Sequence, residues 1–485
     1  MAEERPGLCA EPAPHDRGRF GPAAILFLGV LGSAGPAAAH AFAQRYDLPL
    51  PLWFYLVGAG ATVAVSVPVV AWTAGRGAPS AHRRQPHGGE PGLGRVLRHP
   101  AIRDAIRVLA VGLFVLLITA GLVGPQGDPV DNLLPTAVWV IWWVGLAYVS
   151  AFVGDVWRAI NPWAIIGAWT GALWRRFGPG RASVASDPLP WLAAWPAALL
   201  FLAFGWAELV WPSNAVPAKL ASAILIYSAI TWTGMAIFGV QTWLGRGEAF
   251  ALFFGLFARF APIEPQTLAI RPYGVGLLDE RAVSTSMLGF VVLALALVSF
   301  DGIAETPLWA ELTSAVFAAL HRIDLLAMLG YVAAGSLIKT AGLVLTPLAF
   351  LAVYLAVCRL SVALVGAGGA SATTNRVGAW TTMAVAKRFV LTLVPIAIAY
   401  HLAHYLSYLL IHGQEIIRLA SDPLGLGWNL FGTAARRTDI AIVGARFVWI
   451  TSVVAIVLGH VAALWLAHVI ALRSFGPWRC VASIP

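Results

Sequence analysis

Nine stretches of about 20 apolar residues recur along the chain, and each is long enough to cross roughly 30 Å of hydrocarbon as a helix. Only 11% of the 485 residues are charged, against about 25% in an average soluble domain. This pattern excludes a water-soluble globule and predicts an all-α fold, a polytopic integral membrane helix bundle. The predicted spans are 51–73, 104–124, 133–153, 189–211, 219–240, 282–300, 335–358, 389–411 and 447–472.

A shorter apolar run, residues 21–34, precedes these spans. It follows two arginines and is followed by a stretch of small residues, which is the pattern of a signal peptide. We therefore expect residues 1–39 to be a signal peptide or an uncleaved signal anchor, and residues 40–485 to form a single transmembrane helical domain. Cleavage after Ala39 would make His40 the new N-terminus.

The positions of the basic residues predict the orientation. With the mature N-terminus outside, 24 of the 32 lysines and arginines fall on the cytoplasmic side and seven outside, with Lys339 inside a span. This asymmetry is what the positive-inside rule requires. We expect a bacterial inner-membrane protein with a cytoplasmic C-terminus, and we assign the net charge of +9 to this bias rather than to nucleic-acid binding.

Three connections mix aromatic and charged residues at helical spacing, which is typical of amphipathic helices lying in the membrane interface. Residues 155–176 and 241–262 should lie on the cytoplasmic side, and residues 301–326 on the periplasmic side. The two cytoplasmic connections also carry compact polar groups, for which lipid phosphate binding is the favoured role. These groups are Asp155, Arg158 and Asn161 in the first connection, and Arg246, Glu248 and Arg259 in the second.

Intramembrane histidines are the first candidate site, because ionisable groups at bilayer depth are costly and usually functional. His401 and His404 are three residues apart and share a helix face that continues to His412. His401 should lie roughly 15 Å, and His460 roughly 20 Å, below the outer ends of their spans. The three deeper imidazoles, His401, His404 and His460, could bind a metal ion or a haem, or could hold two helices together by hydrogen bonds.

Carboxylates and histidines also gather, by predicted depth, at the periplasmic face. Such a mixture suits a divalent-metal hydrolase site, in which the ion activates water. The alternative is that the carboxylates are solvated, or that Asp301 and Glu305 cap the helix starting near residue 306. The full set is His40, Asp47, Glu208, Asp301, Glu305, His404, His412 and Glu415.

Several strings resemble a known family. They are residues 40–53 (HAFAQRYDLPLPLW), 161–163 (NPW), 246–250 (RGEAF), 299–302 (SFDG), 305–309 (ETPLW) and 401–405 (HLAHY). Together they resemble bacterial multi-pass membrane proteins known as fenitrothion hydrolase, an organophosphate triester hydrolase, or as uncharacterised membrane proteins. The resemblance implies a membrane fold over most of the chain and hydrolysis of a phosphotriester, and it brings no catalytic motif with it.

Three classes of function follow. A hydrolase would act on a small lipophilic substrate with a zinc, manganese or iron ion. A transporter would use the intramembrane histidines as a relay, and a subunit with a membrane or periplasmic partner would use them for a cofactor, for which haem is less suited. In the hydrolase, His40, His404 and His412 would bind the metal, Asp47, Asp301 and Glu305 would provide catalytic carboxylates, and His401 and His460 would support the cofactor site.

The orientation is testable with topology reporters. A reporter fused after Gln126 should show periplasmic activity, and one fused after Arg181 should show cytoplasmic activity, because the intervening span crosses once. Alkaline phosphatase and fluorescent-protein fusions measure the two sides. The reverse pattern at both sites would contradict the predicted orientation.

Overall fold

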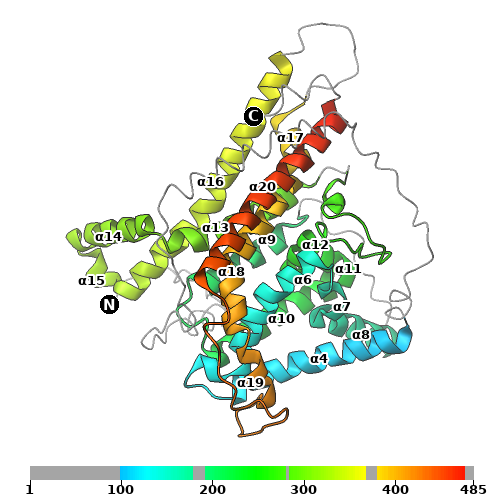
Figure 1. The fold of residues 1–485 in the computed structure, drawn as a ribbon, viewed down its shortest axis with the longest axis vertical. Helices are drawn as coiled ribbons and strands as arrows, with labels where there is room; N and C mark the ends of the chain where they lie inside the picture. The colour runs from blue at the N-terminus through cyan, green and yellow to red at the C-terminus, as the bar shows by residue number, and fades with distance from the viewer. Residues whose placement is uncertain (1–98, 178–191, 280–282, 368–379, 476–485) are drawn as a thin grey trace, which may run out of the picture.

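The computed structural model describes residues 99–177, 192–279, 283–367 and 380–475, and helices make up most of this part of the chain (Figure 1). The elements are α4 (Pro100–Val123), η1 (Pro129–Asp131), α5 (Leu133–Pro135), η2 (Thr136–Gly145), α6 (Leu146–Phe152), α7 (Trp157–Ile160), α8 (Pro162–Phe177), α9 (Trp195–Leu209), α10 (Pro217–Phe238), α11 (Val240–Arg246), α12 (Ala249–Ala258), η3 (Val275–Leu277), α13 (Thr285–Ala304), α14 (Pro307–Arg322), α15 (Leu325–Leu329), α16 (Tyr331–Ala367), α17 (Thr382–Phe389), η4 (Val390–Leu393), α18 (Val394–His412), α19 (Glu415–Ser421) and α20 (Ala445–Phe475).

Within the described residues, seven helices are long and apolar enough to cross a membrane. The all-helical, multi-pass prediction is therefore confirmed, and seven of the nine predicted spans have a counterpart. The predicted span 189–211 appears as α9, whose 15 residues rise about 22 Å and fall short of the hydrocarbon thickness. The predicted span 51–73 and the signal-like segment 1–39 lie outside the described residues.

The core is built around α13. Every residue from Phe290 to Phe300 is buried, as expected for a helix that is apolar on all sides and surrounded by other helices. Helices α9, α16 and α18 pack against it. In Figure 1, α13, α16, α18 and α20 run obliquely through the molecule, whereas α14 and α15 project to one side.

The segment 241–262 differs from the amphipathic interfacial helix that its sequence suggests. It forms α11 and α12, and α12 packs against α6 and α9 with the side chains of Phe250, Phe253, Phe254 and Phe257 buried. The interfacial interpretation is wrong for α12, because its aromatic residues are covered by protein. Ten residues span only about 15 Å, so α12 is a short buried helix rather than a membrane crossing.

The segment 301–326 divides between two helices. Asp301 belongs to the last turn of α13, and α14 begins after Thr306, whose side chain accepts a hydrogen bond from the Trp309 backbone N–H. Thr306 is thus the N-cap of α14, and the alternative that Asp301 and Glu305 cap this helix is wrong. α14 has no buried residue, which agrees with an interfacial helix.

Helices α18 and α20 pack closely, as expected for the eighth and ninth spans. A Cβ atom at Gly459 of α20 would collide with Ala399 and with the backbone carbonyl of Pro395 in α18. The Ser452 hydroxyl donates a hydrogen bond to the Ala403 carbonyl at 3.1 Å. A small residue at the contact and a hydroxyl bound to a backbone carbonyl are both typical of helix packing in membranes.

The segments 155–176 and 241–262 are joined by the carboxylate of Glu248, which is fully buried at the N-cap of α12. One oxygen accepts from the Tyr227 hydroxyl (2.6 Å) and the Phe250 N–H, and the other from the Asn161 amide (3.0 Å) and the Ala251 N–H. Burial raises the pKa of the Glu248 carboxyl, and these hydrogen bonds oppose the shift. Glu248 is therefore a structural joint rather than a lipid contact.

Replacing Glu248 should lower the thermal stability of the protein. Glu248→Ala leaves four buried donors without an acceptor, at about 1–3 kcal/mol for each, whereas Glu248→Gln keeps one acceptor oxygen and should lie between Ala and wild type. The measurement is the unfolding temperature in detergent, followed by fluorescence-detected size exclusion. Glu311→Ala, on the exposed face of α14, is the control. Equal effects of Glu248→Ala and Glu311→Ala on the unfolding temperature would contradict a stabilising role for Glu248.

Candidate functional site

Three helices bring ionisable side chains together near their C-terminal ends. Glu208 is in the last turn of α9, Asp301 is in the last turn of α13, and His404 and Tyr405 lie in the second half of α18. The C-terminal end of a helix carries a partial negative charge, which disfavours a carboxylate. The two acids must therefore be stabilised by other side chains.

The acids are held in one hydrogen-bonded cluster, which we call the outer cluster and which consists of Glu208, Asp301, His404 and Tyr405. His404 Nε2 lies 2.5 Å from Asp301 Oδ2. The Tyr405 hydroxyl lies 2.8 Å from the same oxygen and 3.1 Å from Glu208 Oε1. The side chains of His404 and Asp301 are 10% and 17% exposed, so the pair is nearly but not fully enclosed.

Counting hydrogen atoms shows that the outer cluster is a site of proton sharing. A tyrosine hydroxyl has one hydrogen to donate and accepts with its lone pairs. The Tyr405 hydroxyl faces two carboxyl oxygens, so it can donate to only one of them. The second contact is satisfied only when that carboxyl is itself protonated and donates to Tyr405. The arrangement thus stabilises at least one proton held between the two acids.

His401 lies one turn deeper in α18 and is 2% exposed. Neither ring nitrogen has a hydrogen-bond partner in the part of the chain that the structure describes. The imidazole is enclosed by Trp143, Tyr148 and Tyr405, whose ring centroids lie 5.5, 5.6 and 4.8 Å away. Buried polar groups are almost always hydrogen-bonded, so the imidazole of His401 is a candidate functional group, and the buried His468 shares this feature.

The wall behind His401 is η2, a ten-residue π-helix. Trp143 of η2 packs on His401, and the preceding residue, Trp142, contacts Phe250 at 4.4 Å between ring centroids. π-helical turns are rare and occur often at functional sites, because they change the direction in which side chains project. Here the π-helix places Trp143 against His401 and Trp142 against Phe250.

Trp142 lines a large apolar cavity on the opposite side of η2. Its volume is about 1830 Å³, larger than the roughly 300–1,000 Å³ of an ordinary small-ligand pocket. Its walls come from α4, η2, α8, α9 and α10, and Lys219 is the one formally charged residue among the described residues that line it. Tyr148 of α6, which contacts His401, also lines the cavity, so one side chain lies between the cavity and His401.

Of the residues proposed from the sequence, the structure brings Asp301 and His404 together and adds Glu208. The ring centroid of His412 lies 5.2 Å from that of Tyr408, with the two rings tilted, and Glu305 is the C-cap residue of α13. His460 Nδ1 lies 2.8 Å from the Ile456 carbonyl of its own helix, and its ring faces Tyr400 rather than His401. His40 and Asp47 lie outside the described residues.

The described residues include no group of three histidine, cysteine, aspartate or glutamate side chains arranged to hold a metal ion. Asp301 and His404 hydrogen-bond to each other, and Glu208 reaches them through the Tyr405 hydroxyl. Binding of zinc, manganese or iron stays a prediction, since the predicted ligand His40 lies outside the described residues, and the chemistry below is derived from the described side chains alone.

Sequence reasoning missed Tyr405 and the aromatic enclosure of His401. Tyr405 is four residues after His401, on the same helix face, so its spacing could have placed it in the site. No local signal identifies Trp143 or Tyr148, because their proximity to α18 depends on long-range packing.

No protein-family model, curated protein or solved structure matches the chain.

Proposed function

We propose that the protein is a membrane hydrolase of lipophilic esters, with the His404–Asp301 pair as its acid–base centre. The observation that supports this most directly is the meeting of His404, Asp301, Tyr405 and Glu208 from three helices in one nearly enclosed hydrogen-bonded cluster. A carboxylate bound to an imidazole orients the ring and stabilises it when it takes a proton. Organophosphate triesters are the substrate class that the sequence resemblance implies.

In this proposal the His404–Asp301 pair takes a proton from water as the water oxygen attacks phosphorus. The bond from phosphorus to the leaving alkoxide or phenoxide breaks, and the proton returns to that leaving group. The products are a phosphodiester and an alcohol or phenol, and the phosphodiester then releases its remaining acidic proton to bulk water. Tyr405 and Glu208 hold a second proton next to Asp301, which limits the build-up of negative charge in the outer cluster.

Hydrolysis of a chromogenic aryl dialkyl phosphorothioate by purified protein in liposomes tests this proposal. His404→Ala and Asp301→Ala should each lower the rate by about 10²–10⁴-fold, the usual contribution of a positioned acid–base group. His460→Ala, which removes an imidazole outside the outer cluster, should keep the wild-type rate. Wild-type protein without activity, or full activity in both cluster variants, would contradict the proposal.

A second candidate, proton-coupled transport, is supported by His401 alone. Its unpaired imidazole lies one turn deeper than His404, so a proton held in the outer cluster has a further acceptor toward the middle of the bilayer. Buried ionisable residues in series are typical of proton relays.

Proton movement in liposomes that contain a trapped pH-sensitive dye tests the second candidate. Wild-type protein should acidify the lumen when a potential, negative inside, is applied, and His401→Gln should abolish this flux because its amide cannot accept and release a proton at neutral pH. His412→Ala, in the same helix, is the matched control. No flux through the wild-type protein would contradict transport and leave the hydrolase proposal intact.

A further inference from the structure

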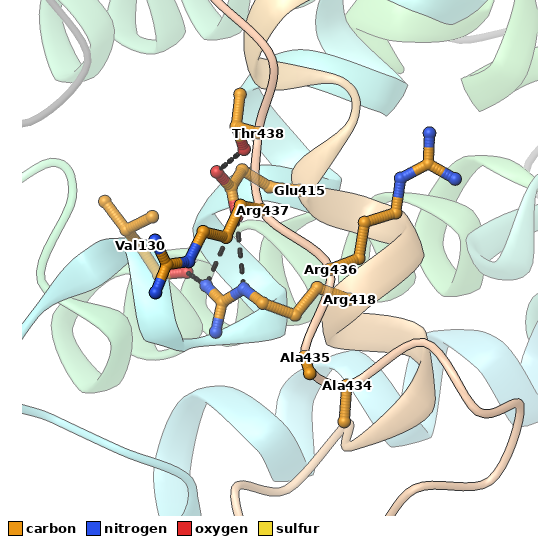
Figure 2. A pocket seen from close by; sticks show the side chains of 8 residues that line it. All are labelled: Val130, Glu415, Arg418, Ala434, Ala435, Arg436, Arg437 and Thr438. Carbon is orange, nitrogen blue, oxygen red and sulfur yellow. Dashed lines mark hydrogen bonds and ion pairs between the residues drawn. The ribbon is translucent and has the colours of Figure 1, made fainter.

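A second hollow, which we call the arginine pocket, lies beside the apolar cavity. Figure 2 shows the side chains that line it. Its volume is about 350 Å³, and it is formed by α19 and the loop that follows. The residues that line it are Val130, Glu415, Arg418, Ala434, Ala435, Arg436, Arg437 and Thr438.

The short helix α19 separates the two hollows. Glu415 and Arg418 face the arginine pocket, whereas Ile416 and Ala420 line the apolar cavity. The loop after α19 repeats this division, since Leu430 and Phe431 line the cavity and the segment 434–438 lines the pocket. An amphiphile could therefore extend from one hollow into the other around α19.

One arginine fixes the shape of the pocket. The Arg418 guanidinium donates to the Val130 carbonyl at 2.9 Å and pairs with Asp131 and Glu415, both at 3.2 Å. Glu415 also accepts a hydrogen bond from the Thr438 hydroxyl, which ties the loop to α19. Arg418 is thus balanced by two carboxylates and holds α19 against the turn before α5.

The other two arginines have no such partner. Arg436 and Arg437 are exposed, and among the described residues no side chain forms an ion pair with either guanidinium. Figure 2 shows the Arg437 side chain next to Arg418, with Arg436 directed to the opposite side of the loop. Counted over the whole lining, the three arginines exceed Glu415 and the adjoining Asp131 by one positive charge, which favours an anion.

The position of the pocket matches the level of lipid headgroups. It directly follows the ends of two membrane-crossing helices, α4 at Val123 and α18 at His412. Lys219, the charged residue of the cavity lining, lies at the same end, because the neighbouring Ala218 N–H bonds to Gln126, just after α4. The cavity thus has an apolar interior and basic residues at its headgroup end.

We propose that this composite site binds an anionic phospholipid, with the headgroup phosphate in the arginine pocket and the acyl chains in the apolar cavity. Charge complementarity selects the headgroup, since arginine forms bidentate hydrogen bonds with phosphate. The cavity volume and its apolar lining select the chains. The site does not depend on the proposed hydrolase activity.

Lipid retention by the purified full chain tests the proposal. Protein extracted from membranes containing zwitterionic and anionic phospholipids is purified in detergent, and the lipid retained for each chain is measured by mass spectrometry. Wild-type protein should retain anionic lipid selectively. Arg436→Glu with Arg437→Glu should lower this retention at least about tenfold. Each basic residue near an anionic membrane surface changes lipid affinity by roughly fivefold, and two are replaced here. Arg175→Glu with Arg176→Glu, at the distant end of α8, is the matched control.

A cavity variant provides a second, independent measurement. Ala223→Trp fills part of the apolar cavity without changing charge, and it should lower the retention of the same lipid. Equal retention in the wild-type and Arg436/Arg437 variants would overturn the proposal, as would equal retention of zwitterionic lipid. If millimolar inorganic phosphate bound in the pocket of lipid-free protein, the pocket would be a site for a free anion, and this result would also overturn the proposal. Disulfide cross-linking of cavity residues to residues 51–73 would show that a segment of the chain itself fills the cavity. That result would also overturn the proposal.

Discussion

The Tyr405 hydroxyl lies between the carboxyl groups of Glu208 and Asp301, and this contact links polar side chains of three helices. In an apolar environment a polar group without a partner is costly. The C-terminal ends of α9, α13 and α18 therefore meet where their polar side chains can satisfy one another. Glu248 does the same for α8, α10 and α12 through Asn161, Tyr227 and its own N-cap hydrogen bonds. The rest of the described bundle is held mainly by apolar packing around α13.

The two polar centres differ in one property that separates structure from function. Glu248 receives four hydrogen bonds from four donors, so both of its oxygens are satisfied without any further proton. The outer cluster places one tyrosine hydrogen between two acids and leaves a nearby imidazole, His401, without a partner in the described chain. A satisfied network resists change, whereas a network with a shared proton can take up and release protons at low cost. This difference is why the function is assigned to the outer cluster.

Hydropathy and charge bias predicted most of the fold, because span length and the cost of buried charge are properties of local sequence. The expected depth of the ionisable groups is why Asp301, Glu208 and His404 were all proposed for one face, and the structure brings these three side chains together. The depth of a residue in the bilayer does not determine which neighbouring helix its side chain faces. His460 has a depth similar to that of His401, yet His460 faces Tyr400 and its own helix while His401 faces Trp143 of η2. The burial of α12, the π-helix η2 and the gathering of Arg418 with Arg436 and Arg437 likewise depend on long-range packing that no local pattern encodes.

The position of η2 between the apolar cavity and the outer cluster constrains both proposed functions. Trp142 lines the cavity and the next residue, Trp143, contacts His401, so neighbouring side chains of one helix contact the cavity and the site. A lipophilic substrate in the cavity meets Trp142 and Tyr148 before it can meet His404. Access to the outer cluster from the cavity therefore requires that this wall move, or that the substrate enter from the outer surface, where His404 and Asp301 are partly exposed. A π-helix is suited to the first route, because a return to α-helical hydrogen bonding would rotate the tryptophans relative to α18 without unfolding the helix.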